Sequence, residues 1–270
     1  MEAEAAIGVF DSGIGGLSVL RHIRAALPHE ALLYFADSGN APYGDKTEEA
    51  VVARSLAVAE FLMQYRVKAL VVACNTATAA AIKGLRARYP ALPVVGVEPG
   101  LKPAAALTRN GIVGVLATSR TLSSQKFNAL REQIAAAARV RFLPQACVGL
   151  ADQVEKGELH SAATALLLRR YIEPLLAQGA DTLVLGCTHY PFVRPLIEEI
   201  IASLTVDPVA LVDTGEPIAR QLVRLLDQRG LLNVEGNGAL SGFTTGSETA
   251  LTSAFGKLLG MQAPVAAIAG

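Results

Sequence analysis

Short runs of branched apolar residues recur along the whole chain, separated by longer stretches in which polar and apolar residues mix. The runs are rich in Val, Ile and Leu and lack a polar–apolar alternation, a pattern typical of parallel strands that are buried on both faces. We predict such strands at IGVF (7–10), LLYFA (32–36), ALVVA (69–73), VVGV (94–97), IVGVLA (112–117), VRFL (140–143), LVLG (183–186) and VALVD (209–213).

The stretches between these runs carry helical periodicity. In EEAVVARSLAVAEFLMQY (48–65), for example, Val52, Leu56, Ala59 and Met63 recur at helical spacing. We expect Asp45 to cap this helix, with a capping box completed by Glu48. Strands that alternate with helices in this way predict the α/β fold class.

The two halves of the chain resemble each other. IGVFDSGIGG from residue 7 resembles VGVLATSRTL from residue 113, ALVVACNTATA from 69 resembles TLVLGCTHYPF from 182, and VVGVEPG from 94 resembles VALVDTGEP from 209. The offset is 106 residues for the first pair and 113 from Cys74 to Cys187, so it drifts slowly. We therefore predict two similar doubly wound domains with mostly parallel sheets. Any two α/β units share Val-rich strands, but a cysteine after the same apolar run in both halves makes coincidence a weak explanation.

Composition narrows the class of partner. The chain has 270 residues, 51% of them hydrophobic, and 24 Lys and Arg balance 24 Asp and Glu. A balanced charge favours neither nucleic acid nor an anionic membrane surface, so we expect a small-molecule partner, no nucleic acid and no membrane. The acidic start lacks the features of a signal peptide, and no apolar run is long enough to span a bilayer.

Three cysteines, Cys74, Cys147 and Cys187, lie far apart and form no C-x-x-C pair. This spacing argues against a zinc site and against a disulfide framework, so we expect no metal and free thiols in a reducing compartment. The predicted location is cytoplasmic.

Cys74 and Cys187 lie in polar clusters, CNTAT and CTHYP, at the carboxyl ends of predicted strands. Ligands of open parallel sheets bind at these ends, so two facing sheets would bring both thiols to one ligand in the cleft between the domains, where we place the active site. A cysteine can act as a base in its thiolate form and as an acid in its thiol form. Two of them on opposite faces of one carbon meet the requirement for stereochemical inversion, because one removes a proton and the other returns one.

Other interpretations of the cysteines remain open at this point. Cys147, in LPQACVGL, has no cluster of donors around it and is expected to be a small buried hydrophobic residue. Cys187 with His189 would also suit a thiol nucleophile and its base, but that hypothesis leaves Cys74 without a role.

Two further strand-end motifs offer ligand contacts. In FDSGIGG, which lacks the spacing of a dinucleotide loop, Asp11 and Ser12 can contact an ammonium and a carboxylate group; alternatively, Asp11 only caps the next helix. In YFADSGNAPYG, Pro42 and Gly44 shape the backbone around Tyr43, unless this is an ordinary surface turn. No lysine stands where a pyridoxal phosphate anchor would, so we expect no cofactor.

These motifs together resemble the cofactor-independent glutamate racemase family, which supplies D-glutamate for peptidoglycan of the bacterial cell wall. The similar stretches are GVFDSGIGGLSVL, YFADSGNAPYG, VVACNTATA, GVEPG, VLATSRT, VLGCTHYPF and LVDTGEP. The resemblance implies that Cys74 and Cys187 transfer the proton, assisted by Asp11 and His189. It further implies substrate contacts from Asp11, Ser12, Tyr43, Gly44, Asn75, Thr76, Thr118, Thr121, Thr188 and His189.

The resemblance also implies a division into two domains. The first domain would comprise residues 1–97 plus 208–270 and the second residues 98–207, and we expect a homodimer. Arg120 stands where relatives often have glycine, so we expect this loop to be shaped differently. The leader before residue 7 is short, so we expect no activation by a cell-wall precursor. Aspartate or another small acid as the substrate, or a non-catalytic amino-acid-binding protein, are the alternatives that remain.

Overall fold

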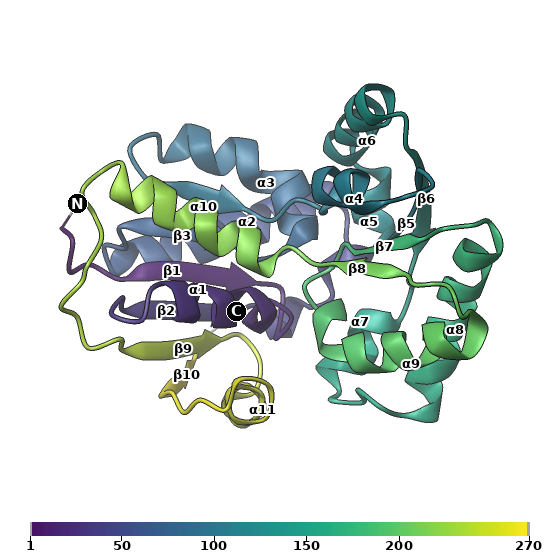
Figure 1. Cartoon of the computed structure of the whole chain (residues 1–270). Helices are drawn as coiled ribbons and strands as arrows, with labels where there is room; N and C mark the ends of the chain where they lie inside the picture. Colours follow the sequence, from purple (N-terminus) through teal and green to yellow (C-terminus); the bar gives the residue numbers. More distant parts are fainter. Residues whose placement is uncertain (1, 269–270) are drawn as a thin grey trace. The chain divides into compact units, whose positions relative to one another are not determined.

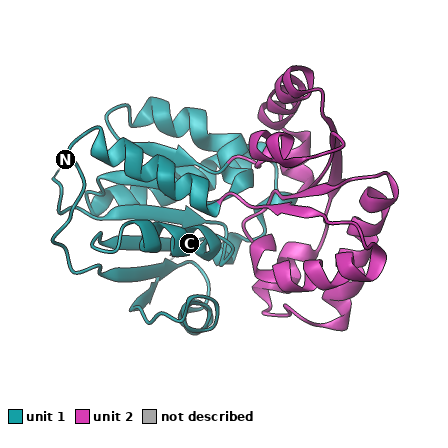
Figure 2. Cartoon of the chain, viewed as in Figure 1, with its two compact units in different colours: residues 1–97, 215–270 teal, residues 98–214 magenta. Residues whose placement is uncertain are grey.

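The computed structural model describes residues 2–268 and divides into two compact units. The first comprises residues 1–97 and 215–270, and the second comprises residues 98–214 (Figure 2). Each unit contains one sheet in which all the strand pairs are parallel. The chain therefore has the two α/β domains with parallel sheets that the sequence predicts.

The sheet of the first unit has six strands in the order β10-β9-β2-β1-β3-β4. Their bounds are β1 (Ile7–Asp11), β2 (Leu32–Ala36), β3 (Ala69–Val72), β4 (Val94–Gly96), β9 (Leu240–Thr244) and β10 (Val265–Ala267). Every residue of the central strands β1 and β3 is buried, as continuous apolar runs require. Strands β9 and β10 were not predicted, and they extend the sheet beyond β2.

Helices cover both faces of this sheet (Figure 1). Helix α1 packs against α10, and α2 packs against α3. This division follows from right-handed crossovers, which place α1 on one face and both α2 and α3 on the other. The helical elements of this unit are α1 (Leu17–Ala26), η1 (Ser38–Asn40), η2 (Tyr43–Asp45), α2 (Glu48–Gln64), α3 (Asn75–Arg88), α10 (Gly215–Asp227), α11 (Glu248–Ala254) and η4 (Phe255–Leu259).

Helix α2 departs from the predicted details. Its N-cap is Thr47, whose side chain accepts a hydrogen bond from the Ala50 N–H, so the expectation that Asp45 caps the helix was wrong. The fully buried stripe shares Ala59 with the predicted one, but the other three predicted positions are each displaced by one residue. It consists of Val51, Ser55, Val58, Ala59 and Leu62.

The sheet of the second unit has four strands in the order β6-β5-β7-β8. They are β5 (Ile112–Ala117), β6 (Arg141–Ala146), β7 (Thr182–Leu185) and β8 (Ala210–Val212). The helical elements are α4 (Leu101–Leu107), α5 (Ser119–Ser123), α6 (Gln125–Ala138), α7 (Leu150–Glu155), α8 (Ala162–Ala177), η3 (Tyr190–Val193) and α9 (Arg194–Leu204). The order of these strands matches β2-β1-β3-β4 of the first unit, so the topology repeats as the sequence does.

The expected return of the chain at residue 208 differs from the structure. Residues 208–214 belong to the second unit, because β8 pairs with β7 in its sheet, with Leu183 opposite Leu211. The first unit resumes at Gly215, where α10 begins.

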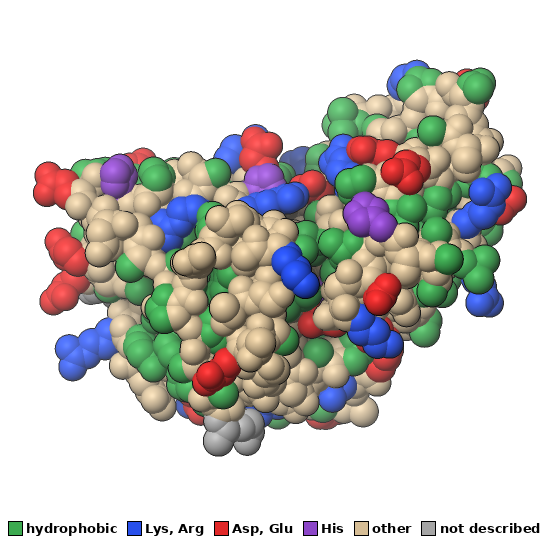
Figure 3. All heavy atoms as spheres, turned by 90° about the horizontal axis from the view of Figure 1, so that it is seen from below, with side chains coloured by type: hydrophobic (Ala, Val, Ile, Leu, Met, Phe, Trp, Pro, Cys, Tyr) green, Lys and Arg blue, Asp and Glu red, His purple; other side chains and the backbone are tan. Residues whose placement is uncertain are grey.

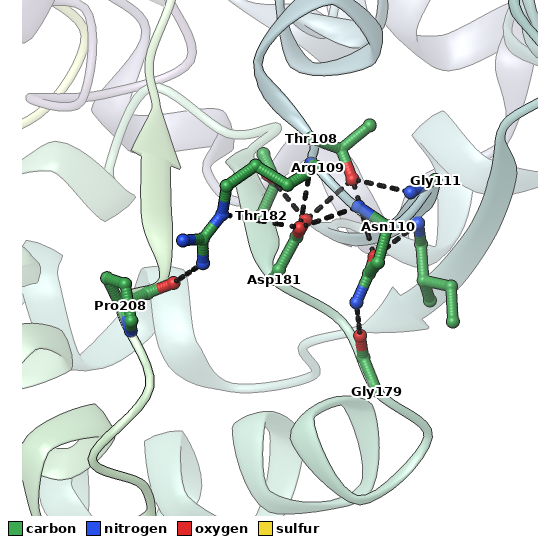
Figure 4. A network of polar contacts seen from close by, with 9 residues as sticks. Thr108, Arg109, Asn110, Gly111, Gly179, Asp181, Thr182 and Pro208 are labelled. Atoms are coloured by element: carbon green, nitrogen blue, oxygen red, sulfur yellow. Dashed lines mark hydrogen bonds and ion pairs between the residues drawn. The ribbon is translucent and has the colours of Figure 1, made fainter.

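A network around Asp181 ties together the segments that enter β5, β7 and β8 of the second sheet (Figure 4). The Asp181 carboxylate accepts hydrogen bonds from the Thr108 hydroxyl at 2.6 Å and from the N–H groups of Arg109 and Asn110 at 2.8 and 3.0 Å. The Arg109 guanidinium donates to the Pro208 carbonyl at 2.8 Å. These bonds fix the turn before β5 against the segments that enter β7 and β8.

The surface carries charges of both signs. Figure 3 shows one face, on which acidic and basic side chains are interspersed, in keeping with the balanced composition. Within residues 2–268, no helix combines the length and the apolar character that crossing a bilayer requires.

Candidate functional site

The carboxyl ends of β1, β2 and β3 bring several of the predicted residues of the first unit to one edge of its sheet. Asp11 ends β1, and its carbonyl accepts the N–H of Asp37, the residue that follows β2, at 3.0 Å. The N–H of Ala73, which follows β3, donates to the carbonyl of Phe10 at 2.7 Å. Cys74 therefore emerges beside the end of β1.

Cys74 is the N-cap residue of α3 and is 5% exposed. Its sulfur accepts the Ala77 N–H at 3.5 Å, and the hydroxyl of Ser12 lies 3.9 Å from it. The amino end of a helix presents free N–H groups and a positive partial charge, which favour an anionic sulfur. This position therefore suits a thiol that has to act as a base.

Asp11 is fully buried and has a structural contact. One of its carboxylate oxygens accepts the N–H of Gly16, the N-cap residue of α1, at 2.7 Å. A Cβ atom on Gly16 would lie 2.7 Å from the Cβ atom of Asp11, so only glycine fits there. Asp11 therefore stabilises the start of α1, as the capping alternative expected, and this contact is compatible with a further role.

Asn75 and Thr76 form the first turn of α3, and both are buried. The side-chain amide of Asn75 donates to the carbonyl of Val97 at 3.4 Å. This contact ties the start of α3 to the segment that follows β4.

Tyr43 and Gly44 lie in η2, within the turn between β2 and α2. The Tyr43 hydroxyl donates to the Asp37 carboxylate at 2.6 Å, and Arg54 donates two further hydrogen bonds to that carboxylate. Burial, reinforced by the Asp37 carboxylate, raises the pKa of Tyr43 above its ordinary value. Burial alone would raise the pKa of Asp37, but its hydrogen-bond donors outweigh burial and lower it.

In the second unit, Cys187 follows β7 as Cys74 follows β3. Its sulfur lies 3.5 Å from Nδ1 of His189, and Nε2 of His189 lies 2.6 Å from the carboxylate of Glu155, at the end of α7. Burial opposes a charge on the imidazole, but the neighbouring Cys187 sulfur and Glu155 carboxylate outweigh it and raise the pKa of His189 well above its ordinary value. A protonated His189 can donate a hydrogen bond to the sulfur.

The predicted threonines of the second unit lie at the same sheet edge. Thr118 follows β5 and is the N-cap of α5. Its hydroxyl oxygen accepts the Thr121 N–H at 3.2 Å, and its O–H donates to the Thr121 hydroxyl oxygen at 3.0 Å. The N–H of Gly186 donates to the carbonyl of Leu116 at 2.7 Å, so the segment before Cys187 runs beside the end of β5. Thr188 follows Cys187 and is 5% exposed.

Cys147 occupies the position in the second unit that Asp37 occupies in the first. Its N–H donates to the carbonyl of Ala117 at the end of β5, as the N–H of Asp37 donates to that of Asp11. Cys147 is 3% exposed, and burial raises the pKa of its thiol. A thiol with a raised pKa stays protonated, which is compatible with the packing role expected for it.

Asp37, Arg54 and Glu155 belong to these sites but were not singled out in the sequence. Asp37 had a usable signal, because it directly follows the predicted strand LLYFA, as Asp11 follows IGVF. Arg54 and Glu155 had none, since each lies within a helical stretch and follows no strand end.

A second region of the second unit is hollow but offers no comparable chemistry. A cavity of about 650 Å³ lies at the opposite edge of the sheet, beside Arg109, Asn110, Asp181 and Asp207. The donors of the Asp181 network already occupy the carboxylate of that residue. Among the described residues, no three His, Cys, Asp or Glu side chains gather into a cluster able to hold a metal ion.

Comparison with known proteins agrees with these motifs. Residues 7–222 match the model of a family described as Asp/Glu/Hydantoin racemase. The glutamate racemase of Ectopseudomonas mendocina is 53% identical over 264 residues, which cover 98% of each chain.

Two solved glutamate racemases are similar in structure. That of Bacillus anthracis (isoform RacE1) has a TM-score of 0.88 and 34% identity, with 99% of this chain and 98% of that one covered. That of Francisella tularensis, in complex with D-glutamate, has a TM-score of 0.86 and 28% identity, with 98% of each chain covered.

Proposed function

Because the chain belongs to the Asp/Glu/hydantoin racemase family, and racemases are isomerases, we propose that it interconverts L-glutamate and D-glutamate. The choice of glutamate is supported by the name of the relative from E. mendocina, which matches nearly the full length, and by the D-glutamate held by the similar protein from F. tularensis.

The observation that carries the mechanism is the equivalence of the two thiols. Cys74 and Cys187 each stand two residues beyond the third strand of a repeated sheet, one in each unit. Each has a polar partner at its sulfur, the Ala77 N–H in one unit and the His189 imidazole in the other. A pair of equivalent, polar-flanked thiols fits acid–base work at two faces of one carbon.

In this mechanism, one cysteine starts as a thiolate and the other as a thiol. The thiolate takes the α-hydrogen of glutamate as a proton, and the electron pair of the C–H bond remains on a planar carbanion. The thiol then gives its proton to the opposite face of the α-carbon and becomes the thiolate. The proton count balances, no redox change occurs, and the reverse reaction exchanges the roles of the two cysteines.

The residues around each thiol assist the transfer in this proposal. His189 donates to the sulfur of Cys187 and is oriented by Glu155. Asp11, at the end of β1, assists Cys74. Substrate contacts are assigned to the residues that the resemblance predicts in both units. These are Asp11, Ser12, Tyr43, Gly44, Asn75, Thr76, Thr118, Thr121, Thr188 and His189.

The biological role follows from the product. We place the enzyme in the cytoplasm, where free thiols such as its three cysteines stay reduced, and we assign it the supply of D-glutamate for peptidoglycan.

Incubation of the purified chain with L-glutamate in deuterated water, without added cofactor, tests the proposal. The expected product is D-glutamate that carries deuterium at the α-carbon, detected by chiral chromatography with mass spectrometry. L-aspartate in a parallel incubation is the control for substrate choice, and a higher kcat/KM for aspartate would reassign the substrate. Binding of glutamate with neither inversion nor exchange would refute a racemase.

A further inference from the structure

The turn at residues 37–46 connects β2 to α2 and carries Tyr43 and Gly44. We propose that Arg54 and Thr245 are positioning residues for this turn, and that they act through the buried carboxylate of Asp37. This inference rests on the proposed function, which places Tyr43 and Gly44 against the substrate.

The carboxylate of Asp37 is the centre of the arrangement. It is fully buried and accepts five hydrogen bonds. A carboxylate offers roughly four lone-pair sites, so these donors occupy all of its capacity. Asp37 therefore holds structure together and has no free site with which to accept a proton from a substrate.

Two of the five bonds come from one arginine. Nε of Arg54 lies 3.0 Å from one oxygen of Asp37, and Nη2 lies 2.9 Å from the other. Such a bidentate pair fixes orientation as well as distance, which a lysine at this position would not do. Arg54 thereby connects α2 to the base of the turn.

Thr245 brings in a segment that is distant in the sequence. Its hydroxyl donates to Asp37 at 2.8 Å and accepts the N–H of Gly39 at 3.0 Å, and its own N–H donates to the carbonyl of Ala36 at 3.2 Å. The approach is close, because a Cβ atom on Gly39 would lie 2.5 Å from the carbonyl oxygen of Thr245. The residue that follows β9 therefore clamps the turn at its start.

Asp37 connects Arg54 and Thr245 to the predicted substrate contacts through its hydrogen bond with Tyr43. The Tyr43 side chain is 1% exposed, and its hydroxyl lies 2.6 Å from Asp37, so the position of Asp37 sets the position of Tyr43 and of the adjoining Gly44. When Asp37 loses a donor, the turn has fewer contacts that fix it, and the geometry of a binding site suffers from displacements of about 1 Å.

A small cavity beside Arg54 and Thr245 allows their contacts with Asp37 to be tested by substitution. About 280 Å³ of space lies beside Arg54 and Thr245, lined also by Glu60, Phe61 and Gln64. Water can enter a polar space of this size and solvate Asp37 when a donor is removed. Substitutions at Arg54 and Thr245 are therefore expected to leave the protein folded.

The test compares Thr245→Val, which keeps the shape but removes the hydroxyl, with Thr245→Ser, which restores it, and with Arg54→Met. Arg220→Met is the matched control, because Arg220 is in the same unit and pairs with Glu216 on the surface. Each protein is measured for glutamate racemisation and for hydrogen–deuterium exchange of residues 37–46 without substrate.

We expect Thr245→Val and Arg54→Met to raise the KM for glutamate about tenfold, with kcat within about threefold, and to exchange faster over residues 37–46. Thr245→Ser should return both values to within about twofold of the wild-type protein. Exchange as slow as in Arg220→Met, or faster exchange with an unchanged KM, would overturn the positioning role. The exchange measurement stays informative even if the wild-type chain does not racemise glutamate, a result that would refute the proposed function separately.

Discussion

The His189 imidazole lies between the sulfur of Cys187 and the carboxylate of Glu155. Both neighbours favour the protonated ring, and together they outweigh the burial that opposes a charge, so the pKa of His189 is raised well above its ordinary value. A histidine with a raised folded-state pKa contributes stability that is fully present below its unfolded pKa of about 6.5. This contribution is lost as the pH rises through the folded-state value.

Glu155→Gln should therefore lower the pKa of His189, because a neutral amide replaces a carboxylate 2.6 Å from the ring. Titration of the imidazole by NMR measures this directly. The accompanying loss of unfolding free energy, relative to the wild-type protein, should be larger near pH 6 than above the folded-state pKa of His189. Glu158→Gln, on an exposed residue nearby, is the control. An unchanged His189 midpoint in Glu155→Gln would contradict this account of the pair.

Local sequence patterns indicate candidate residues next to strand ends but not those that contact the candidate site from other elements. Cys74 and Cys187 could be found because each follows an apolar run within a polar cluster. Glu155 contacts His189 across 34 positions of sequence, and Arg54 contacts Asp37 across 17. No local pattern encodes such contacts, because only the tertiary fold brings the partners together.

Among the elements, α2 shows where a pattern predicts a helix correctly but not its details. Apolar residues lie around much of the circumference of this helix. Val51, Val58 and Leu62 are buried, while Val52 and Leu56 are partly buried. Periodicity alone therefore does not decide which stripe faces the core. Strands β9 and β10 were missed for a related reason, because LSGFT and VAA have few branched apolar residues.

The hydrogen bond that caps α2 is expected to contribute to the stability of the protein. Thr47→Ala should reduce the free energy of unfolding by about 1 kcal/mol, because the Ala50 N–H loses the acceptor that the Thr47 side chain provides. Asp45→Ala, at the cap expected from the sequence, should change it by less than about 0.5 kcal/mol. Urea unfolding of both variants measures the difference, and a larger effect at Asp45 would contradict the assigned cap.

For the whole molecule, the internal repeat was the most informative sequence feature. It predicted two similar doubly wound domains with mostly parallel sheets, and the orders β2-β1-β3-β4 and β6-β5-β7-β8 correspond strand by strand. The point of return expected from the resemblance, residue 208, was too early. The repeat aligns VALVDTGEP with VVGVEPG, and β8 pairs with β7 as β4 pairs with β3. The equivalence of Cys74 and Cys187 follows from this repeat, and the proposed mechanism depends on it.

The most direct test of the central claim measures glutamate racemisation in deuterated water for three single variants. Cys74→Ala and Cys187→Ala should each lose inversion of L-glutamate, because each lacks one of the two groups that exchange a proton with the α-carbon. Cys147→Ala, which alters the remaining buried thiol, should retain it and is the matched control. If Cys74→Ala or Cys187→Ala produced α-deuterated D-glutamate at the rate of Cys147→Ala, the two-cysteine account would be contradicted.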